Sequence, residues 1–264
     1  MIALELEKVG AVMRILAVGN SFAQDTFTWL PLVAKNLGEQ DTRVARLFQG
    51  GCSIDMHVQN LQQDLPIYTY ATWNGKCWEK QKNFKGVDAI ADGPWDYILI
   101  QHGTKDGSRY SKPESYENLP TLIAMIQKLA PEAKIVFNMT WVGEANKPKS
   151  EMPEYMDRLQ DLYQDIANLT RDLVQPMAGI EKVCPTGTAI ENLRQIYPGK
   201  LCRDGYHLSN DLGRFTAAAA FYHALTGKPI RKLKWQPAGV TASIRRKAIK
   251  AAEAAVAEPY RVSL

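Results

Sequence analysis

The chain has 264 residues, 45% of them apolar and 23% charged, which are the proportions of a globular protein and exclude a disordered or fibrous one. The net charge is only +4 and the basic residues are scattered, so no nucleic-acid partner is expected. The densest basic cluster, at 245–250, is interpreted as the solvated face of a helix. No run of 18 apolar residues exists, and acidic residues interrupt the N-terminal segment, so neither a membrane span nor a signal peptide is expected and a cytoplasmic location is predicted.

In chain order, short apolar runs that end at glycine or polar residues predict strands, and segments with apolar residues at helical spacing predict helices. The expected strands cover 13–18, 43–48, 95–101, 133–140 and 173–178. The expected helices cover 25–37, 54–65, 113–129, 151–170, 188–196, 210–225 and 241–257. This alternation predicts a mostly parallel sheet covered by helices on both faces, in a single domain spanning 1–264.

One segment departs from the alternation. Residues 65–81 contain Asn74-Gly75 between runs rich in aromatic residues and threonine, which predicts an inserted β-hairpin with a type I′ turn. Its aromatic side chains either line a substrate pocket or pack the hairpin onto the sheet; they are Tyr68, Tyr70, Trp73 and Trp78. A C-terminal helical extension is expected from about residue 230 to 264.

The four cysteines stand far apart and form no Cys-x-x-Cys pair; they are Cys52, Cys77, Cys184 and Cys202. Two disulfides are possible on number alone, but reduced, partly buried thiols are expected in a cytoplasmic chain. A zinc site built from these cysteines and four scattered histidines is not expected, and no metal or organic cofactor is predicted.

Ser21 follows the first expected strand in the sequence Gly19-Asn20-Ser21, where a serine hydroxyl can be aimed into a cleft. Asp204 and His207 stand three residues apart in a loop before a later helix. A carboxylate at that spacing can reach back to Nδ1 of the histidine and leave Nε2 available to accept a serine proton, which is the logic of a Ser-His-Asp triad. Alone, such a pair more often consists of a carboxylate that caps a turn and a histidine whose hydrogen bonds are satisfied within the loop.

Together, the Gly-Asn-Ser-Phe and Asp-Gly-Tyr-His motifs resemble those of the SGNH or GDSL hydrolase superfamily, over about residues 13 to 227. The segments "GGCSI" and "WDYILIQ" are similar to a mostly uncharacterised bacterial branch of that superfamily. The resemblance implies a flavodoxin-like three-layer α/β/α sandwich, here with a mostly parallel five-stranded sheet plus the inserted hairpin. It also implies that Ser21 is the nucleophile, His207 the base and Asp204 the residue that orients the base.

The resemblance further implies an oxyanion hole, built from the Ser21 backbone N–H and a glycine N–H after the second strand. Gly51 is preferred for that glycine over Gly50. The superfamily's third donor, an asparagine after the third strand, has no counterpart here, because "IQHGTKDG" puts Lys105 at the matching place. A neutral amide suits the role, so Gln101 is preferred, and His102 is a further candidate.

The predicted function is therefore hydrolysis of an ester bond through an acyl-enzyme, on a small-molecule or carbohydrate ester. A carbohydrate O-acetyl ester is favoured because the flat rings of the hairpin suit sugar faces. The alternative is a non-catalytic ligand-binding module on the same fold. A third possibility, a nucleotide-binding flavodoxin-like protein, has little support because the chain has no glycine-rich phosphate loop. The acyl group, the alcohol and the oligomeric state are not predicted.

Overall fold

A central seven-stranded sheet organises the fold. The computed structural model describes residues 13–102, 111–144 and 158–264. The strand order is β4-β3-β2-β1-β5-β6-β7. The strands are β1 (Arg14–Gly19), β2 (Arg43–Phe48), β3 (Tyr68–Trp73), β4 (Trp78–Phe84), β5 (Tyr97–Gln101), β6 (Lys134–Asn138) and β7 (Ile180–Cys184).

The five strands from β2 to β7 in this order run parallel, and the β3–β4 hairpin adds two antiparallel strands at the β2 edge. The prediction of a flavodoxin-like, mostly parallel sheet is thus confirmed, but the sheet has seven strands instead of five. The difference arises because β3 continues the hydrogen-bonded sheet beyond β2. After β1 the chain forms β2 on one side of this strand and later β5 on its other side, so the strand order switches at β1. A crevice is expected at such a switch point, beyond the carboxyl ends of the strands.

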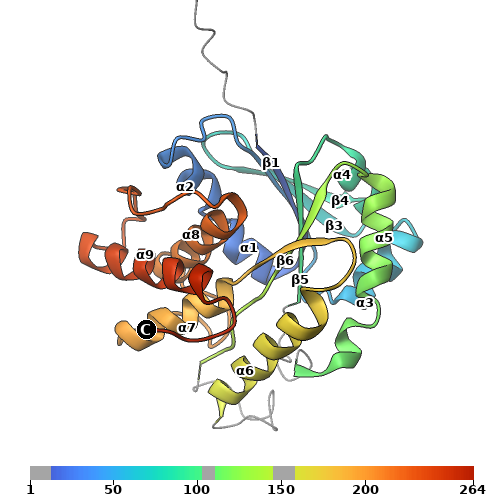
Figure 1. Ribbon diagram of the computed structural model, residues 1–264. Coiled ribbons are helices and arrows are strands. Elements are labelled where there is room, and N and C mark those ends of the chain that lie inside the picture. Colours follow the sequence, from blue (N-terminus) through green and yellow to red (C-terminus); the bar gives the residue numbers. More distant parts are fainter. Residues whose placement is uncertain (1–12, 103–110, 145–157) are drawn as a thin grey trace, which may run out of the picture.

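Helices cover both faces of the sheet (Figure 1). One layer contains α1 (Ser21–Phe27), α2 (Leu30–Asn36), α7 (Thr186–Ile196), α8 (Leu212–Thr226) and α9 (Ala242–Ala257). The other contains α3 (Ile54–Gln62), α4 (Gly86–Ala91) and α5 (Leu119–Leu129). Helix α6 (Leu159–Leu169) packs on a smaller cluster with the C-terminal segment.

Strand β1 shows how the sequence fills both layers. Ile15 and Ala17 face the cluster of α1 and α8, and Leu16 and Val18 face the cluster of α3 and α5. All four are buried, as expected for a central strand covered on both faces. Each larger apolar side chain removed from water in this way stabilises the fold by about 1.5–3 kcal/mol.

The helix expected over 25–37 is two helices. The first begins at Ser21, because the Asn20 side chain caps it, and the second begins at Leu30, with Pro31 in its first turn. The helix expected over 113–129 is likewise divided into a 3₁₀ turn (Pro113–Tyr116) and α5, which has Pro120 in its first turn. Of the helix expected over 151–170, residues 151–157 lie outside the described part of the chain.

The strand expected at 173–178 is wrong. Leu173 and Val174 belong to a π-helical turn (Thr170–Val174) that continues α6, and the strand of this region is β7, at Ile180–Cys184. A short apolar run has no period of its own that separates a buried helical turn from a strand. Leu173 packs against the α3–α5 layer from this helical turn. Such packing between distant segments is not visible in the local sequence.

The hairpin is present, but its turn is not of type I′. Asn74 does not have the positive φ that such a turn requires, whereas Gly75 does. Instead, the Asn74 side chain accepts hydrogen bonds from the backbone N–H groups of Lys76 and Cys77, at 3.0 and 2.9 Å. A longer loop closed by an asparagine side chain therefore joins β3 to β4. The single-domain division, with its insertion and its C-terminal extension, stays a prediction.

Candidate active site

Ser21 is the first residue of α1 and lies at the carboxyl edge of the sheet, directly after β1. The Asn20 side chain accepts a hydrogen bond from the Phe22 backbone N–H at 3.0 Å and so caps the helix. A cap at this position fixes the first turn of α1, with the Ser21 N–H among the helix donors that have no intrahelical partner.

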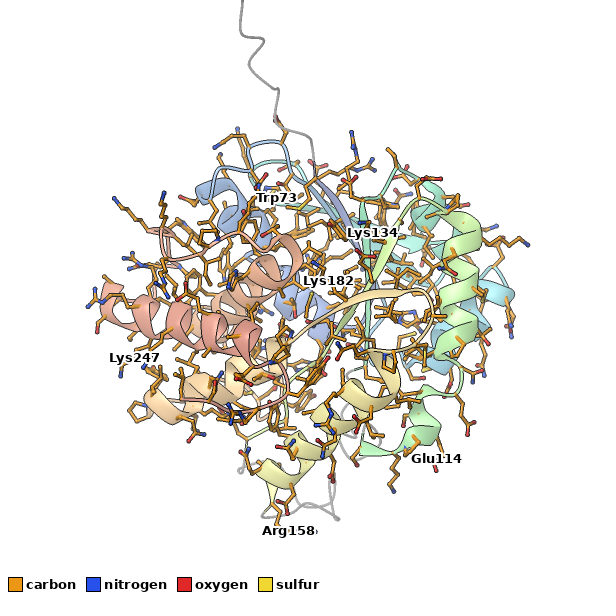
Figure 2. The ribbon with its side chains drawn as sticks, viewed as in Figure 1. Trp73, Glu114, Lys134, Arg158, Lys182 and Lys247 are labelled. Carbon is orange, nitrogen blue, oxygen red and sulfur yellow. The ribbon has the colours of Figure 1, made fainter. Side chains whose placement is uncertain are left out.

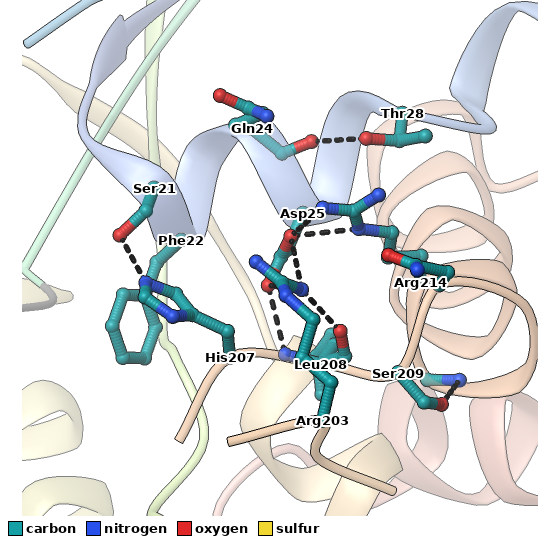
Figure 3. Close-up of polar contacts among 12 residues, drawn as sticks. Ser21, Phe22, Gln24, Asp25, Thr28, Arg203, His207, Leu208, Ser209 and Arg214 are labelled. Atoms are coloured by element: carbon teal, nitrogen blue, oxygen red, sulfur yellow. Dashed lines mark hydrogen bonds and ion pairs between the residues drawn. The ribbon is translucent and has the colours of Figure 1, made fainter. Parts of the chain in front are cut away.

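Side chains from two distant parts of the sequence, Ser21 on one side and Asp204 and His207 on the other, form a continuous hydrogen-bonded chain. Figure 3 shows its contact between Ser21 and His207. His207 Nε2 lies 2.7 Å from Ser21 Oγ, and His207 Nδ1 lies 2.6 Å from Asp204 Oδ2. A carboxylate on Nδ1 keeps the ring proton there and leaves Nε2 as the acceptor for the serine proton. The structure therefore brings together Ser21, His207 and Asp204, as the motifs predicted.

The turn that holds Asp204 and His207 is closed by backbone hydrogen bonds. Asp204 Oδ1 accepts the N–H of His207 at 2.8 Å and that of Tyr206 at 3.3 Å. Gly205 has a φ of +89°, which a residue with a side chain adopts only with strain. Partial burial acts to raise the pKa of Asp204, but its hydrogen bonds to the ring and backbone of His207 outweigh that effect and hold the pKa below its ordinary value.

Aromatic side chains pack around the imidazole. Phe22 stacks on Trp141 at 4.7 Å, and the Tyr206 ring lies 4.1 Å from that of His207. The Trp141 indole N–H donates to the Tyr206 carbonyl at 2.7 Å. Because these contacts limit the rotation of the ring, the hydrogen bond from His207 to Ser21 is held by packing as well as by Asp204.

Two backbone N–H groups were predicted to form the oxyanion hole, those of Ser21 and Gly51. Within the described residues, neither the Ser21 N–H nor the Gly51 N–H has an acceptor. Asn20 Nδ2 donates to the Cys52 carbonyl at 2.9 Å and ties the loop of Gly51 to the residue before Ser21. Gly51 itself has a φ of +65°, the left-handed conformation that favours glycine.

The Gln101 amide, predicted to be the third oxyanion donor, is directed elsewhere. It is 2% exposed, and its Nε2 donates to Asn20 Oδ1 at 2.9 Å. Its Oε1 accepts from Asn138 Nδ2 at 3.5 Å, and the Thr186 hydroxyl donates to Asn138 Oδ1 at 2.9 Å. These buried amides form a row across the ends of β1, β5 and β6 that orients Asn20.

Of the other two candidates for the third donor, His102 is buried edge-on against Tyr116, with the ring centroids 4.4 Å apart. Burial lowers the pKa of His102 to about 3, so the ring is neutral at physiological pH. Lys105 lies outside the described residues.

The aromatic residues of the hairpin do not line the site. Trp73 follows Thr72, which pairs with Ala45 near the start of β2, so it lies at the end of the sheet opposite Ser21. In Figure 2, Trp73 is at the same end of the molecule as Lys134, the first residue of β6. Tyr68 and Tyr70 are buried in the α3–α5 layer, and Trp78 covers the Arg46 guanidinium at 3.6 Å. These rings therefore pack the hairpin onto the sheet.

Sequence reasoning missed three charged residues next to the triad. Asp25 on α1 is buried and forms ion pairs with Arg203, beside the triad residue Asp204, and with Arg214 on α8; both arginines are partly exposed. The only signal for these ion pairs was the four-residue spacing from Ser21 to Asp25, which puts both side chains on one face of a helix.

Other ligand chemistry has little basis in the described residues. They contain no group of three or more histidine, cysteine or acidic residues that could hold a metal ion. All four cysteines are free thiols, and only Cys77 is exposed. Within residues 13–102, 111–144 and 158–264, no helix has the length and apolar character needed to cross a membrane.

The family comparison identifies the chain more closely than the motifs do. The model of a domain of unknown function, DUF4886, matches residues 14–256. The chain belongs to the DUF4886 family. The crystal structure of a DUF4886 family protein from Bacteroides uniformis ATCC 8492 is 30% identical to it, with a TM-score of 0.88, over 96% of this chain and 97% of that one.

More distant structures also match this DUF4886 chain. A protein named as a GDSL-like lipase from Parabacteroides merdae ATCC 43184 is 15% identical, with a TM-score of 0.48, over 81% of this chain and 95% of that one. An acetyl xylan esterase from Geobacillus stearothermophilus is 16% identical, with a TM-score of 0.47, over 85% and 95%. The chain is thus similar to structures named as a GDSL-like lipase and an acetyl xylan esterase, which is the similarity that the motifs predicted. The named activities belong to those proteins, and the search of curated proteins gave no match.

Proposed function

We propose that this DUF4886 protein is a serine hydrolase that cleaves carboxylic esters. The observation that carries the proposal is the continuous hydrogen-bonded chain from Ser21 through His207 to Asp204, with distances of 2.7 and 2.6 Å. A serine is a weak nucleophile unless a base accepts its proton, and these distances are those of an activated serine.

In the first half of the reaction, Ser21 Oγ attacks the ester carbonyl carbon and its proton passes to His207 Nε2. The negative charge that develops on the carbonyl oxygen is stabilised by the backbone N–H groups of Ser21 and Gly51. When the tetrahedral intermediate collapses, the bond between the carbonyl carbon and the alcohol oxygen breaks. The alcohol leaves with the proton from His207, and an acyl-Ser21 ester remains.

In the second half, a water molecule gives a proton to His207 Nε2 and its oxygen attacks the acyl carbon. Collapse of this second intermediate returns the proton to Ser21 Oγ and releases the carboxylic acid. Asp204 stabilises the imidazolium that forms in each half, and its lowered pKa keeps it ionised for that role.

The proposal covers esters as a class and gives no preference to sugars. The reason for expecting a carbohydrate O-acetyl ester was the aromatic hairpin, and Trp73 and Trp78 lie away from Ser21. One observation favours the alternative of a ligand-binding module: the Gln101 amide is committed to Asn20, which leaves two backbone donors for the oxyanion. Two donors support slower catalysis than three, since each is worth about 10²–10³ in kcat.

The test is hydrolysis of p-nitrophenyl acetate and butyrate by the purified protein. Ser21→Ala and His207→Gln are each expected to lower kcat/KM at least a thousandfold, because the first removes the nucleophile and the second removes the base that activates it. The matched controls are Ser243→Ala and His223→Gln, which make the same changes on α9 and α8, Ser243 at an exposed position. Equal rates for the wild type and Ser21→Ala would favour the binding module.

A further inference from the structure

Asp25 is a fully buried carboxylate on the same helix as the proposed nucleophile. It is 0% exposed and stands four residues after Ser21, about one helical turn along α1. A buried carboxylate is expected only where hydrogen bonds and opposite charges compensate its lost hydration. The direction of those compensating contacts therefore indicates what this group holds in place.

The hydrogen bonds of the Asp25 carboxylate reach the histidine loop and the helix that follows it (Figure 3). Oδ2 accepts the backbone N–H of Leu208 at 2.8 Å. Arg203 Nη1 lies 3.1 Å from both carboxylate oxygens, and Arg214 Nε donates to Oδ1 at 2.7 Å.

Two of these contacts lie on either side of the triad residues in the sequence. Arg203 directly precedes Asp204, and Leu208 directly follows His207. Arg203 also closes the loop itself, because its N–H donates to the His207 carbonyl at 2.8 Å and its guanidinium donates to the Leu208 carbonyl. Asp25 thus binds both ends of the loop that carries Asp204 and His207.

The charge of Asp25 is needed as well as its shape. Three arginines surround it: Arg203, Arg214 and Arg46. Burial and repulsion by Arg214 together lower the pKa of Arg46 to about 9, although Asp25 acts in the opposite direction. A neutral side chain at position 25 would leave these guanidinium groups without their shared counter-charge.

We propose that Asp25 is a positioning residue, which fixes the distance between the Ser21 hydroxyl and the His207 imidazole by anchoring the 203–208 loop to the helix of the serine. This inference rests on the proposed hydrolase function. About one turn of the rigid helix α1 separates Ser21 from Asp25. Anchoring the 203–208 loop at Asp25 therefore also sets the distance from this loop to the Ser21 hydroxyl. The competing interpretation is that Asp25 only fastens α1 to α8 and has no effect on the triad.

The test compares Asp25→Asn with Asp96→Asn. Asp96 also accepts a backbone N–H, that of Arg14 at 2.7 Å, but at the start of β1, away from the site. The measured quantity is the second-order rate of Ser21 modification by a fluorophosphonate, at a temperature where circular dichroism shows both variants folded. We expect Asp25→Asn to slow it at least tenfold and Asp96→Asn to leave it within twofold. Equal rates for the two variants would overturn the inference.

A second readout does not depend on catalysis. The His207 Nδ1 proton, held by Asp204, should give a protected downfield NMR signal that His207→Gln assigns by its loss. Asp25→Asn is expected to shift or broaden this signal, and Asp96→Asn to leave it unchanged. If Asp25→Asn does not fold, Arg203→Met decides by the same two measurements, because it removes one attachment while Asp25 keeps Leu208 and Arg214.

The two hypotheses fail separately. A wild type that the phosphonate never modifies refutes the hydrolase, while the NMR signal still decides whether Asp25 positions His207. A wild type that is modified, with the rate and signal unchanged in both Asp25→Asn and Arg203→Met, refutes the positioning role and leaves the hydrolase intact.

Discussion

Replacing Asn20 by aspartate restores the Gly-Asp-Ser motif of the SGNH superfamily, yet we expect it to harm this protein. Asn20 Nδ2 donates to the Cys52 carbonyl at 2.9 Å, and its Oδ1 accepts from both the Phe22 N–H and Gln101 Nε2. These three partners fit an amide in one orientation. An aspartate would place a second acceptor against the Cys52 carbonyl, and the loop of Gly51 would lose its attachment.

The magnitude follows from the two ways in which the variant can respond. The aspartate can take up a proton and donate to Cys52, which at pH 7 costs about 4 kcal/mol for a group with an ordinary pKa near 3.9. Alternatively, the loop moves and a buried hydrogen bond is lost, at about 1–3 kcal/mol. We therefore expect Asn20→Asp to lower the free energy of unfolding by about 1–4 kcal/mol at pH 7.

The pH dependence separates these routes. A proton held by the folded variant means that its aspartate has a pKa raised above the unfolded value, so the folded state gains stability as the pH falls. On this route the deficit against the wild type shrinks by about 1.4 kcal/mol per pH unit between pH 7 and pH 5. On the route in which the loop moves, displacement of Gly51 is expected to lower kcat/KM for p-nitrophenyl acetate about 10- to 100-fold.

The assay is urea unfolding at pH 7, 6 and 5, together with hydrolysis rates. Asn36→Asp is the matched control, because Asn36 also donates to a backbone carbonyl, that of Leu32 at 2.9 Å, but on the exposed side of α2. We expect that control to lose less than about 1 kcal/mol, with full activity. An Asn20→Asp variant with wild-type stability and activity at pH 7 would refute the role given to the Asn20 amide.

Three further predictions follow from the same structure. Burial lowers the pKa of His57 from 6.5 to about 4. Between these pH values the unfolded chain binds a proton that the folded chain does not, so the free energy of unfolding rises with pH. We expect His57→Gln to reduce the loss of stability between pH 7 and pH 5 by about 2 kcal/mol in urea unfolding, and an unchanged difference would contradict this. Gly205→Ala places a side chain at a φ of +89° and should slow phosphonate labelling at least tenfold. The control is Gly38→Ala, at a φ of +101° in a turn where an added Cβ meets no atom within 4 Å, and it should only lower the free energy of unfolding by about 1–2 kcal/mol. Trp73→Ala should lower the urea midpoint and leave hydrolysis of acetylated sugars within twofold; a selective loss on sugar esters would place the hairpin at the site.

The sequence predicted the parts of the site that depend on local spacing. The three residues from Asp204 to His207 determine how the carboxylate reaches Nδ1, and the strand end at Gly19 determines where Ser21 emerges. Parallel topology placed Ser21 at one edge of the sheet, whereas its meeting with Asp204 and His207 was predicted from the resemblance to the two motifs of the superfamily.

The parts that failed depend on contacts between distant segments. Gln101 follows a strand end as predicted, but which way its amide points is decided by Asn20 and Asn138 on neighbouring strands. Asp25 was assigned only to a helix, because its partners lie about 180 residues later in the chain. The strand near 180 was misplaced for a similar reason, since packing against the α3–α5 layer keeps Leu173 helical.

The most direct test of the central claim is mass spectrometry of the folded protein after treatment with a fluorophosphonate, beside Ser21→Ala and His207→Gln. The account predicts one adduct, on Ser21, that is absent in Ser21→Ala and strongly reduced in His207→Gln, where the serine remains but its base does not. Unmodified Ser21 in folded wild-type protein, or equal labelling with and without His207, would contradict the claim that this triad activates the serine.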